Sequence, residues 1–447
     1  MKTNITIIGG GSRQWAIRFM KDLSVDASIE GTLTLYDIDE QAAINNVEVG
    51  ERIFALNSKD PQRFKIVSEN NLGKALTGAN LVLFSIEPGN TTCRKGDLLL
   101  PEEYDILQTV GDTTGPGGIM RAKRALPLFF DFGKALKKYC PKAWIINYTN
   151  PMTLCTAALF KVFPEIKLLG CCHEVFGTQH FIAQLVAKWF NVPEPDRRDI
   201  HLDITGVNHF TFATKAVWNG IDLMPRLCEM ANKKETYKDL TNTAQDRIKN
   251  KKWFDCDHII ALELLKNFGA LGAAGDRHLA EFLPCYLTSD ENIWKRGIMR
   301  TPYSWRIETA EEKRAKIFTD KELTYDESDE EGVAIMKALH GGTPLYTNMN
   351  RLNEGQISYL PLGTVVESNG FISQDSIKPV VSSEPTPAVK NLIQRVSAVQ
   401  QMTLDAIWND DNEALFAAFI EDPLMHLPLD QARELFNKML VASALKY

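Results

Sequence analysis

The chain has 447 residues, of which 44% are hydrophobic and 24% charged, and its formal net charge is −7 at pH 7. This balance is typical of a globular protein and excludes an intrinsically disordered chain. The negative charge argues against a nucleic-acid-binding groove, which needs clustered lysine and arginine. Without a run of about 18 apolar residues or a recognisable signal peptide, we expect no membrane association and a cytoplasmic location.

The first part of the chain alternates short apolar runs with helical patterns. Apolar runs buried on both faces and separated by helices indicate a parallel sheet. We therefore predict an α/β fold with a doubly wound, Rossmann-type sheet over residues 1–172. The predicted strands cover residues 5–8, 32–36, 64–67, 81–86, 143–148 and 166–172, and the predicted helices cover 15–23, 40–56 and 122–139.

The pattern changes after residue 172. A helix is predicted over 178–190, antiparallel strands over 203–210 and 212–218, and mainly helices over 230–330. Strands are predicted again within 358–371, followed by helices that break at Pro423 and Pro428. No flexible linker separates the two parts, so we expect residues 173–447 to form an α/β or α+β substrate, metal-binding and oligomerisation domain with an extensive interface to the first.

A glycine turn follows the first predicted strand. Gly9, Gly10, Gly11 and Ser12 lie between a strand and a helix, where backbone amides can approach a pyrophosphate. Asp37 follows the second strand, where a carboxylate accepts ribose hydroxyls and favours NAD over NADP. Ser85, at the end of the strand over 81–86, is placed with these cofactor residues. The motif departs from the usual pattern at Gln14, where a third glycine is expected. The alternative is a tight turn with a solvated aspartate.

Two asparagines close another predicted strand. Asn147 and Asn150 lie in Asn-Tyr-Thr-Asn-Pro, at a strand end where open α/β sheets bind ligands. Their amides can donate and accept hydrogen bonds, which suits sugar hydroxyls. The alternative is an Asx turn before Pro151.

Cys172, His173 and Glu174 follow the last strand of the predicted sheet, and His209 lies in Gly-Val-Asn-His. A cysteine and a histidine from separate strand ends can bind a divalent metal and leave positions open for substrate. The alternative is that both are packed core residues.

A polar cluster occurs in Gly275-Asp276-Arg277-His278. Asp276 is a candidate catalytic residue, with a helix N-cap as the alternative. The glycine-rich segment 111–118 could hold substrate, line a nicotinamide pocket or only turn the chain.

Together these segments resemble glycoside hydrolase family 4, the NAD- and manganese-dependent glycosidases. The matching pieces are Ile-Gly-Gly-Gly-Ser at 8–12, the segment 111–118, Asn-Tyr-Thr-Asn-Pro at 147–151, Cys-His-Glu-Val at 172–175 and Gly-Val-Asn-His at 206–209. Leu360-Pro361, Val365-Val366-Glu367 and Asp422-Pro423-Leu424 also match, so the resemblance covers nearly the whole chain.

The resemblance implies a fold like that of lactate and malate dehydrogenases, with bound NAD+ and Mn²⁺ or another divalent metal. By position, Cys172 and His209 would be metal ligands, Asn150 and Asn147 would contact substrate, and Asp276 would be the general base. His173 is placed as an assistant in proton transfer, and Glu174 and Arg277 as further substrate contacts. The family's tyrosine base in phospho-sugar members has no clear match.

The Cys-His-Glu-Val form is similar to that of the α-galacturonidases. Galactosidases of the family tend to have Cys-His-Ser, and phospho-glycosidases have Asp or Asn after the cysteine, so we expect no phosphate-reading pocket. In this chemistry, oxidation at C3 makes the C2 proton removable, the glycosidic oxygen is eliminated, and water adds at C1 before the hydride returns.

The leading hypothesis is an α-galacturonidase acting on pectin-derived oligosaccharides. The alternatives are an α-galactosidase or α-glucuronidase of the same family, an NAD-dependent 2-hydroxy-acid dehydrogenase, and a non-catalytic NAD sensor. Arg94, Arg121 and Arg277 are candidates for reading the substrate carboxylate. The family habit also predicts a homodimer or homotetramer.

Overall fold

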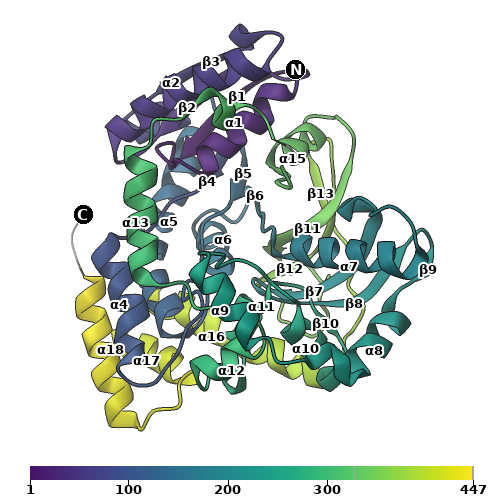
Figure 1. The fold of residues 1–447 in the computed structure, drawn as a ribbon. Helices are drawn as coiled ribbons and strands as arrows, with labels where there is room; N and C mark the ends of the chain where they lie inside the picture. Colours follow the sequence, from purple (N-terminus) through teal and green to yellow (C-terminus); the bar gives the residue numbers. More distant parts are fainter. Residues whose placement is uncertain (327, 445–447) are drawn as a thin grey trace.

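Parallel strands β1 to β6 form the first half of one continuous sheet (Figure 1). The computed structural model describes residues 1–326 and 328–444. The strands are β1 (Lys2–Ile8), β2 (Glu30–Tyr36), β3 (Phe64–Ser68), β4 (Leu81–Phe84), β5 (Trp144–Asn147) and β6 (Lys167–Gly170). Their order across the sheet is β3-β2-β1-β4-β5-β6, which is the Rossmann order. The predicted α/β class with a doubly wound sheet is therefore confirmed.

Helices cover both faces of these strands. They are α1 (Trp15–Val25), α2 (Glu40–Asn57), α3 (Leu72–Leu76), α4 (Thr91–Glu102), α5 (Gly115–Tyr139) and α6 (Met152–Val162). Along β4, Leu81 and Leu83 pack into a core with α1 and α2, whereas Val82 and Phe84 pack into a second core with α5 and α6. Burial on both faces explains why the strands are apolar throughout.

Antiparallel strands extend the sheet beyond β6. These are β7 (Ile200–Val207), β8 (Phe210–Trp218), β9 (Ile221–Asp222), β10 (Leu271–Gly272), β11 (Leu345–Leu352), β12 (Val365–Ser373) and β13 (Ser376–Pro379). The order continues β6-β11-β12-β7-β8-β10, and β11 joins β6 where Asn350 pairs with Gly170. This pairing joins the parallel strands, with the glycine turn after β1, and the β7–β8 hairpin in one continuous sheet.

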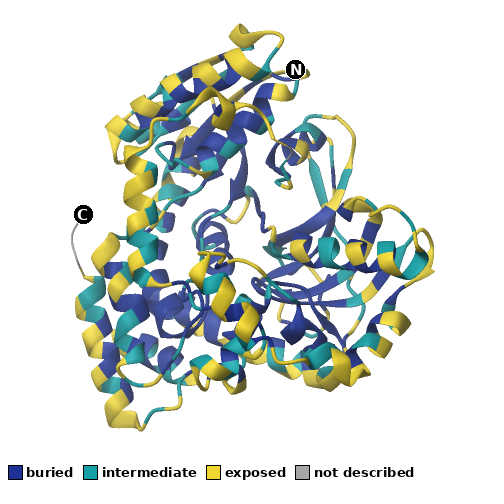
Figure 2. Ribbon diagram, viewed as in Figure 1, coloured by how far each residue is buried: buried dark blue, intermediate teal, exposed yellow. Residues whose placement is uncertain are grey.

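The remaining helices pack on this second half of the sheet or return to the helices of the first half (Figure 1). They are α7 (Glu174–Phe190), α8 (Met224–Asn232), α9 (Thr241–Lys249), α10 (Ile259–Phe268), α11 (Asp276–Ala280), α12 (Asp290–Trp294), α13 (Tyr303–Ala315), α14 (Asp320–Leu323), α15 (Gly332–Leu339), α16 (Pro387–Trp408), α17 (Asn412–Glu421) and α18 (Leu429–Ser443). The C-terminal helices return beside α4 and α5 (Figure 1), and their outer faces are exposed (Figure 2). One hydrophobic core runs from β4, α5 and α6 into α16, α17 and α18. The expected extensive interface is thus present, and the domain boundary at residue 172 stays a prediction.

Several elements differ from the prediction. Helices α3, α4 and α6 were not predicted, and α5 begins earlier than expected, at Gly115 in the glycine-rich segment, where Asp422 Oδ2 accepts the Gly115 N–H at 2.9 Å. The strand β11 was not predicted, because its buried face carries asparagines instead of apolar residues. Among the described helices, none combines the length and apolar character needed to cross a bilayer.

Candidate active site

The turn after β1 allows close contact between backbones. Gly9 has φ of +94°, and the amides of Gly9 and Gly10 donate to the last carbonyl of β2 at 2.9 and 2.8 Å. A Cβ on Gly9 would lie 2.0 Å from the carbonyl oxygen of Ser85, so no side chain fits there. The Ser12 hydroxyl accepts the N–H of Trp15, the first residue of α1, at 3.1 Å.

Asp37 lies directly beside this turn. Its Oδ2 accepts the N–H of Gly11 at 2.9 Å, and a Cβ on Gly11 would lie equally close to that oxygen. The first turn of α1 carries no acidic residue, so the positive end of its dipole is not neutralised. These features fit a dinucleotide, with its pyrophosphate at the turn and its ribose hydroxyls at Asp37.

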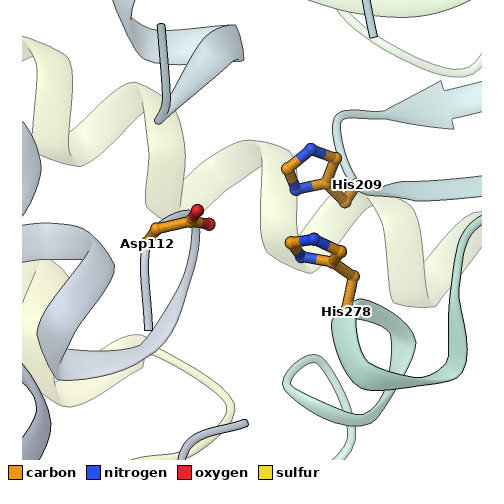
Figure 3. Close-up of side chains that lie close together, drawn as sticks. All are labelled: Asp112, His209 and His278. Carbon is orange, nitrogen blue, oxygen red and sulfur yellow. The ribbon is translucent and has the colours of Figure 1, made fainter. Parts of the chain in front are cut away.

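Asp112, His209 and His278 converge from three separate elements (Figure 3). Asp112 lies in the loop before α5, His209 between β7 and β8, and His278 in α11. One ligand atom from each lies within 4.8 Å of the others, and within residues 1–326 and 328–444 no second set of this kind is found. A carboxylate with two imidazoles is a suitable donor set for a divalent transition metal.

Hydrogen bonds orient these side chains. Thr113 Oγ1 lies 3.0 Å from Nδ1 of His209, which leaves Nε2 of that ring for another ligand. The His278 ring lies 3.9 Å from the His209 ring, centroid to centroid, and its Nδ1 is buried without a hydrogen-bond partner. Asn150 Nδ2 donates to Asp112 Oδ2 at 3.3 Å. A bound cation would satisfy the unpartnered nitrogen, so the residues fit a metal.

The charges of the cluster match this role. Burial alone would raise the pKa of Asp112, but the imidazoles of His278 and His209 hold it well below its usual range. Burial, reinforced by His278, lowers the pKa of His209 to about 3. At neutral pH Asp112 is therefore anionic and His209 is neutral, which are the forms that bind metals.

Cys172 is buried beside this cluster but is not a member of it. Burial, followed by the carboxylates of Glu367 and Glu174, raises the pKa of the thiol well above its usual value. The backbone carbonyl of Cys172 accepts the Asn348 amide at 3.1 Å. The structure thus groups His209 with Asp112 and His278, and the assignment of Cys172 as a ligand stays a prediction from the resemblance.

His173 and Glu174 point to different neighbours. The His173 Nδ1 lies 3.2 Å from Glu330 Oε1, and its ring stacks on Trp15 at 5.8 Å. Burial would lower the pKa of His173, but Glu330 and Glu174 raise it to about 9. His173 therefore carries a proton at neutral pH.

Glu174 joins the motif to the histidine cluster. Its Oε2 accepts the Gly275 N–H at 2.8 Å, and its Oε1 lies 3.6 Å from His278 Nε2. Burial would raise the pKa of Glu174, but the imidazoles of His278 and His209 lower it to about 2. Its charge therefore stabilises the segment that carries His278.

Asp276 faces a helix terminus. Its Oδ1 accepts the Ala261 N–H at 3.1 Å in the first turn of α10, and its Oδ2 is buried without a partner. Burial raises the pKa of Asp276 to about 7. The carboxylate thus caps α10, whereas the capping alternative considered from the sequence concerned the helix of Asp276 itself.

The two asparagines differ in their surroundings. Asn150 contacts Asp112 and has its Oδ1 buried without a partner, so it can accept a ligand hydroxyl. Asn147 Oδ1 accepts the Thr149 N–H at 2.9 Å, and its amide donates to Thr149 O and Thr156. Asn147 therefore forms the Asx turn that was the alternative, and its contact with substrate stays a prediction.

Asp112 and His278 lie in motifs that the sequence singles out, but neither residue was predicted as a metal ligand. Asp112 lies in the glycine-rich segment and His278 in the polar cluster. The available signal was a titratable side chain in each motif, but only the folded chain shows that they meet.

Models of known families match nearly the whole chain. The model described as family 4 glycosyl hydrolase matches residues 4–188, and that of its C-terminal domain matches residues 204–425. The chain belongs to glycosyl hydrolase family 4. The resemblance inferred from the motifs is therefore confirmed.

Relatives within family 4 are similar over their full length. The α-galacturonidase of Bacillus subtilis is 40% identical over 440 residues, covering 98% of this chain and 96% of that protein. The α-galacturonidase of Thermoanaerobacter italicus is 42% identical over 443 residues, covering 97% and 95%. The crystal structure of the lplD protein of Bacillus subtilis has a TM-score of 0.90 at 40% identity, covering 98% of this chain and 100% of that one.

A more distant structure shares the fold. The 6-phospho-β-glucosidase of Thermotoga maritima, solved with manganese, NAD+ and glucose-6-phosphate, has a TM-score of 0.74 at 20% identity and covers 98% of each chain.

Proposed function

We propose that this family 4 enzyme is an α-galacturonidase that uses NAD+ and a divalent metal such as Mn²⁺. The assignment of the substrate rests on the similarity of this chain, at 40% and 42% identity over nearly its full length, to α-galacturonidases. The Cys-His-Glu-Val sequence at 172–175 supports the same class. The substrate is a sugar, and we propose that it is an α-linked galacturonide derived from pectin.

The glycine turn and Asp37 would hold NAD+, and Asp112, His209 and His278 would hold the metal, with Cys172 as a further proposed ligand. When bound, NAD+ supplies reversible oxidation at C3 and the metal supplies Lewis acidity at the neighbouring oxygens, which together make the C2 proton removable. Asn150, which contacts Asp112, would orient the sugar hydroxyls.

The acid and base are proposed from position. Asp276 is assigned as the base for the C2 proton, because its Oδ2 is buried without a partner. His173, held by Glu330, is assigned to proton transfer at the glycosidic oxygen. Glu174, 3.6 Å from His278 Nε2, keeps that ring in place and is proposed as a substrate contact together with Arg277.

We also propose a cytoplasmic homodimer or homotetramer. The cysteines are free thiols, in keeping with a reducing compartment. Light scattering on the purified protein measures the oligomeric state, and a monomer would contradict this part of the proposal.

Release of galacturonic acid from an aryl α-galacturonide tests the function. The assay contains NAD+, Mn²⁺ and a reductant, and each is omitted in turn. We expect activity that is lost without NAD+ or without metal. Cleavage of the matching α-galactoside with none of the galacturonide would overturn the substrate assignment and keep the family chemistry.

A further inference from the structure

Three arginines from distant parts of the chain converge on one loop. Arg94 comes from α4, Arg277 from α11 and Arg306 from α13. Arg94 donates to the carbonyls of Gly111 and Val110 at 2.8 and 2.7 Å. Arg306 donates to the same Val110 carbonyl at 3.5 Å, and Arg277 to the Thr109 carbonyl at 3.4 Å. The loop 109–111 thus accepts hydrogen bonds from three guanidinium groups, and the N–H groups of Val110 and Gly111 donate to the Glu281 carboxylate at 2.7 and 2.8 Å.

The direct hydrogen-bond partners of these arginines are neutral, and the carboxylates of Glu174, Glu281 and Asp112 act on Arg277 only through space. Apart from the carbonyls, Arg277 donates to the Thr301 hydroxyl at 2.9 Å and lies over the Phe254 ring. In the part of the chain that the structure describes, none of the three forms an ion pair with a carboxylate. The Nε atoms of Arg277 and Arg306 are buried without any hydrogen-bond partner. Three guanidinium groups and one carboxylate, that of Glu281, contact this loop, so an excess of positive charge with unused donors favours an anion.

The electrostatics agree with this arrangement. Burial, together with the charges of Arg94 and Arg277, lowers the pKa of Arg306 to about 9. The carboxylates of Asp112 and Glu87 offset part of this repulsion, and a bound anion would offset more of it.

Neighbouring arginines show what a structural role looks like. The Arg121 guanidinium pairs with Glu87 and donates to the Asn150 carbonyl. Arg124 pairs with the buried Asp97. Their charges are already compensated, so Arg121, one of the candidates from the sequence, has no fork free for a ligand.

The location of the three arginines points to the substrate. The loop 109–111 leads directly into Asp112, and Arg277 precedes His278, so the arginines border the metal-binding cluster. An anionic group attached to a sugar ring in that cluster would lie within their reach.

We propose that Arg306 and Arg277, with Arg94, bind the carboxylate of the galacturonic acid unit whose glycosidic bond is cleaved. This assignment rests on the proposed function. A planar guanidinium matches a carboxylate in two parallel hydrogen bonds, and in Arg277 and Arg306 the Nε–H group has no partner. Arg306 was not a candidate from the sequence, because nothing local distinguishes it from other arginines of α13.

Kinetics with two substrates test the assignment. Arg306→Gln is compared with Arg314→Gln, an exposed arginine of the same helix, in the enzyme supplied with NAD+ and Mn²⁺. For an aryl α-galacturonide, R306Q should raise KM about 10- to 100-fold with kcat largely kept, as expected for a lost charge-assisted interaction. R314Q should behave like the unaltered enzyme. Arg306→Lys keeps the charge but loses the planar guanidinium, and its KM should lie between those of R306Q and R314Q.

Binding without turnover provides the second measurement. Calorimetry with galacturonate and galactose should show a preference for galacturonate in the unaltered enzyme, and the preference should collapse in R306Q and in Arg277→Gln. Folding is checked by melting temperature, and R306Q should fold because α13 has no buried residue.

The outcomes separate the two proposals. If the unaltered enzyme neither cleaves the galacturonide nor prefers galacturonate, the proposed function fails and this assignment fails with it. If it does both, but R306Q and R277Q keep the KM and preference of R314Q, only the arginine assignment is overturned.

Discussion

A buried ion pair fixes the segment that contacts His173, and loss of this pair should lower the free energy of unfolding. Arg197, between α7 and β7, donates to Glu331 Oε1 at 2.9 Å, and the two side chains are 2% and 3% exposed. Arg197 also donates to the Asp329 carbonyl at 2.8 Å and lies 3.8 Å above the Phe176 ring. Glu331 follows Glu330, the residue that pairs with His173.

Arg197→Met should lower the free energy of unfolding by about 3–5 kcal/mol, because it leaves the Glu331 carboxylate buried without its cation. Chemical denaturation measures the change. The matched control is Arg198→Met, because Arg198 pairs with Asp196 at the surface, where the two side chains are 47% and 49% exposed. That variant should lose about 0–1 kcal/mol.

A double variant separates the pair from the packing. Arg197→Met with Glu331→Gln removes the buried charge and should recover part of the loss. Equal costs for the Arg197 and Arg198 variants would refute the argument that burial makes the first pair important.

Three further predictions concern the site and its surroundings. Asp276→Asn keeps an oxygen to cap α10 but removes the proposed base, so kcat should fall by about 100-fold or more with an unchanged melting temperature; unchanged kcat would remove Asp276 from catalysis. Asp22 has its pKa raised to about 7 by burial, so the folded protein holds this proton more tightly than the unfolded chain, and stability should fall between about pH 4 and pH 7. Asp22→Asn should lack that part of the fall and gain at most about 4 kcal/mol above pH 7, and parallel stability–pH curves for the two proteins would contradict this. His278→Gln should weaken Mn²⁺ binding about 10- to 100-fold in a metal titration, and an unaltered titration would place the metal elsewhere.

The parallel sheet was predictable because its signal is local. In β4 every residue is buried, since Leu81 and Leu83 face one core and Val82 and Phe84 the other. Short apolar runs between helices therefore predict a doubly wound parallel sheet.

β11 was not predictable for the opposite reason. Its buried Asn348 donates to Glu367 at 2.7 Å, and its buried Asn350 donates to the sulfur of Met152 at 3.4 Å. Polar residues satisfied by distant partners hide the alternation on which strand prediction depends.

The site was predictable only in part. Strand ends predicted Asn150, which follows the parallel strand β5, and His209, which lies in the turn between the antiparallel strands β7 and β8; the structure places both close to Asp112. The role of Cys172, predicted from the end of β6, stays a prediction. The grouping of His209 with Asp112 and His278 depends on contacts between three separate elements. No spacing in the sequence records such contacts.

The most direct test of the central claim is hydrolysis of an aryl α-galacturonide in D₂O, with NAD+ and Mn²⁺ present, followed by NMR of the product. If the C2 proton is removed and replaced during turnover, the released galacturonate carries deuterium at C2. A glycosidase that uses two carboxylates leaves the C2 proton in place. Product with deuterium at C2 is the predicted result, and efficient release of galacturonate with C2 fully protonated would contradict the account.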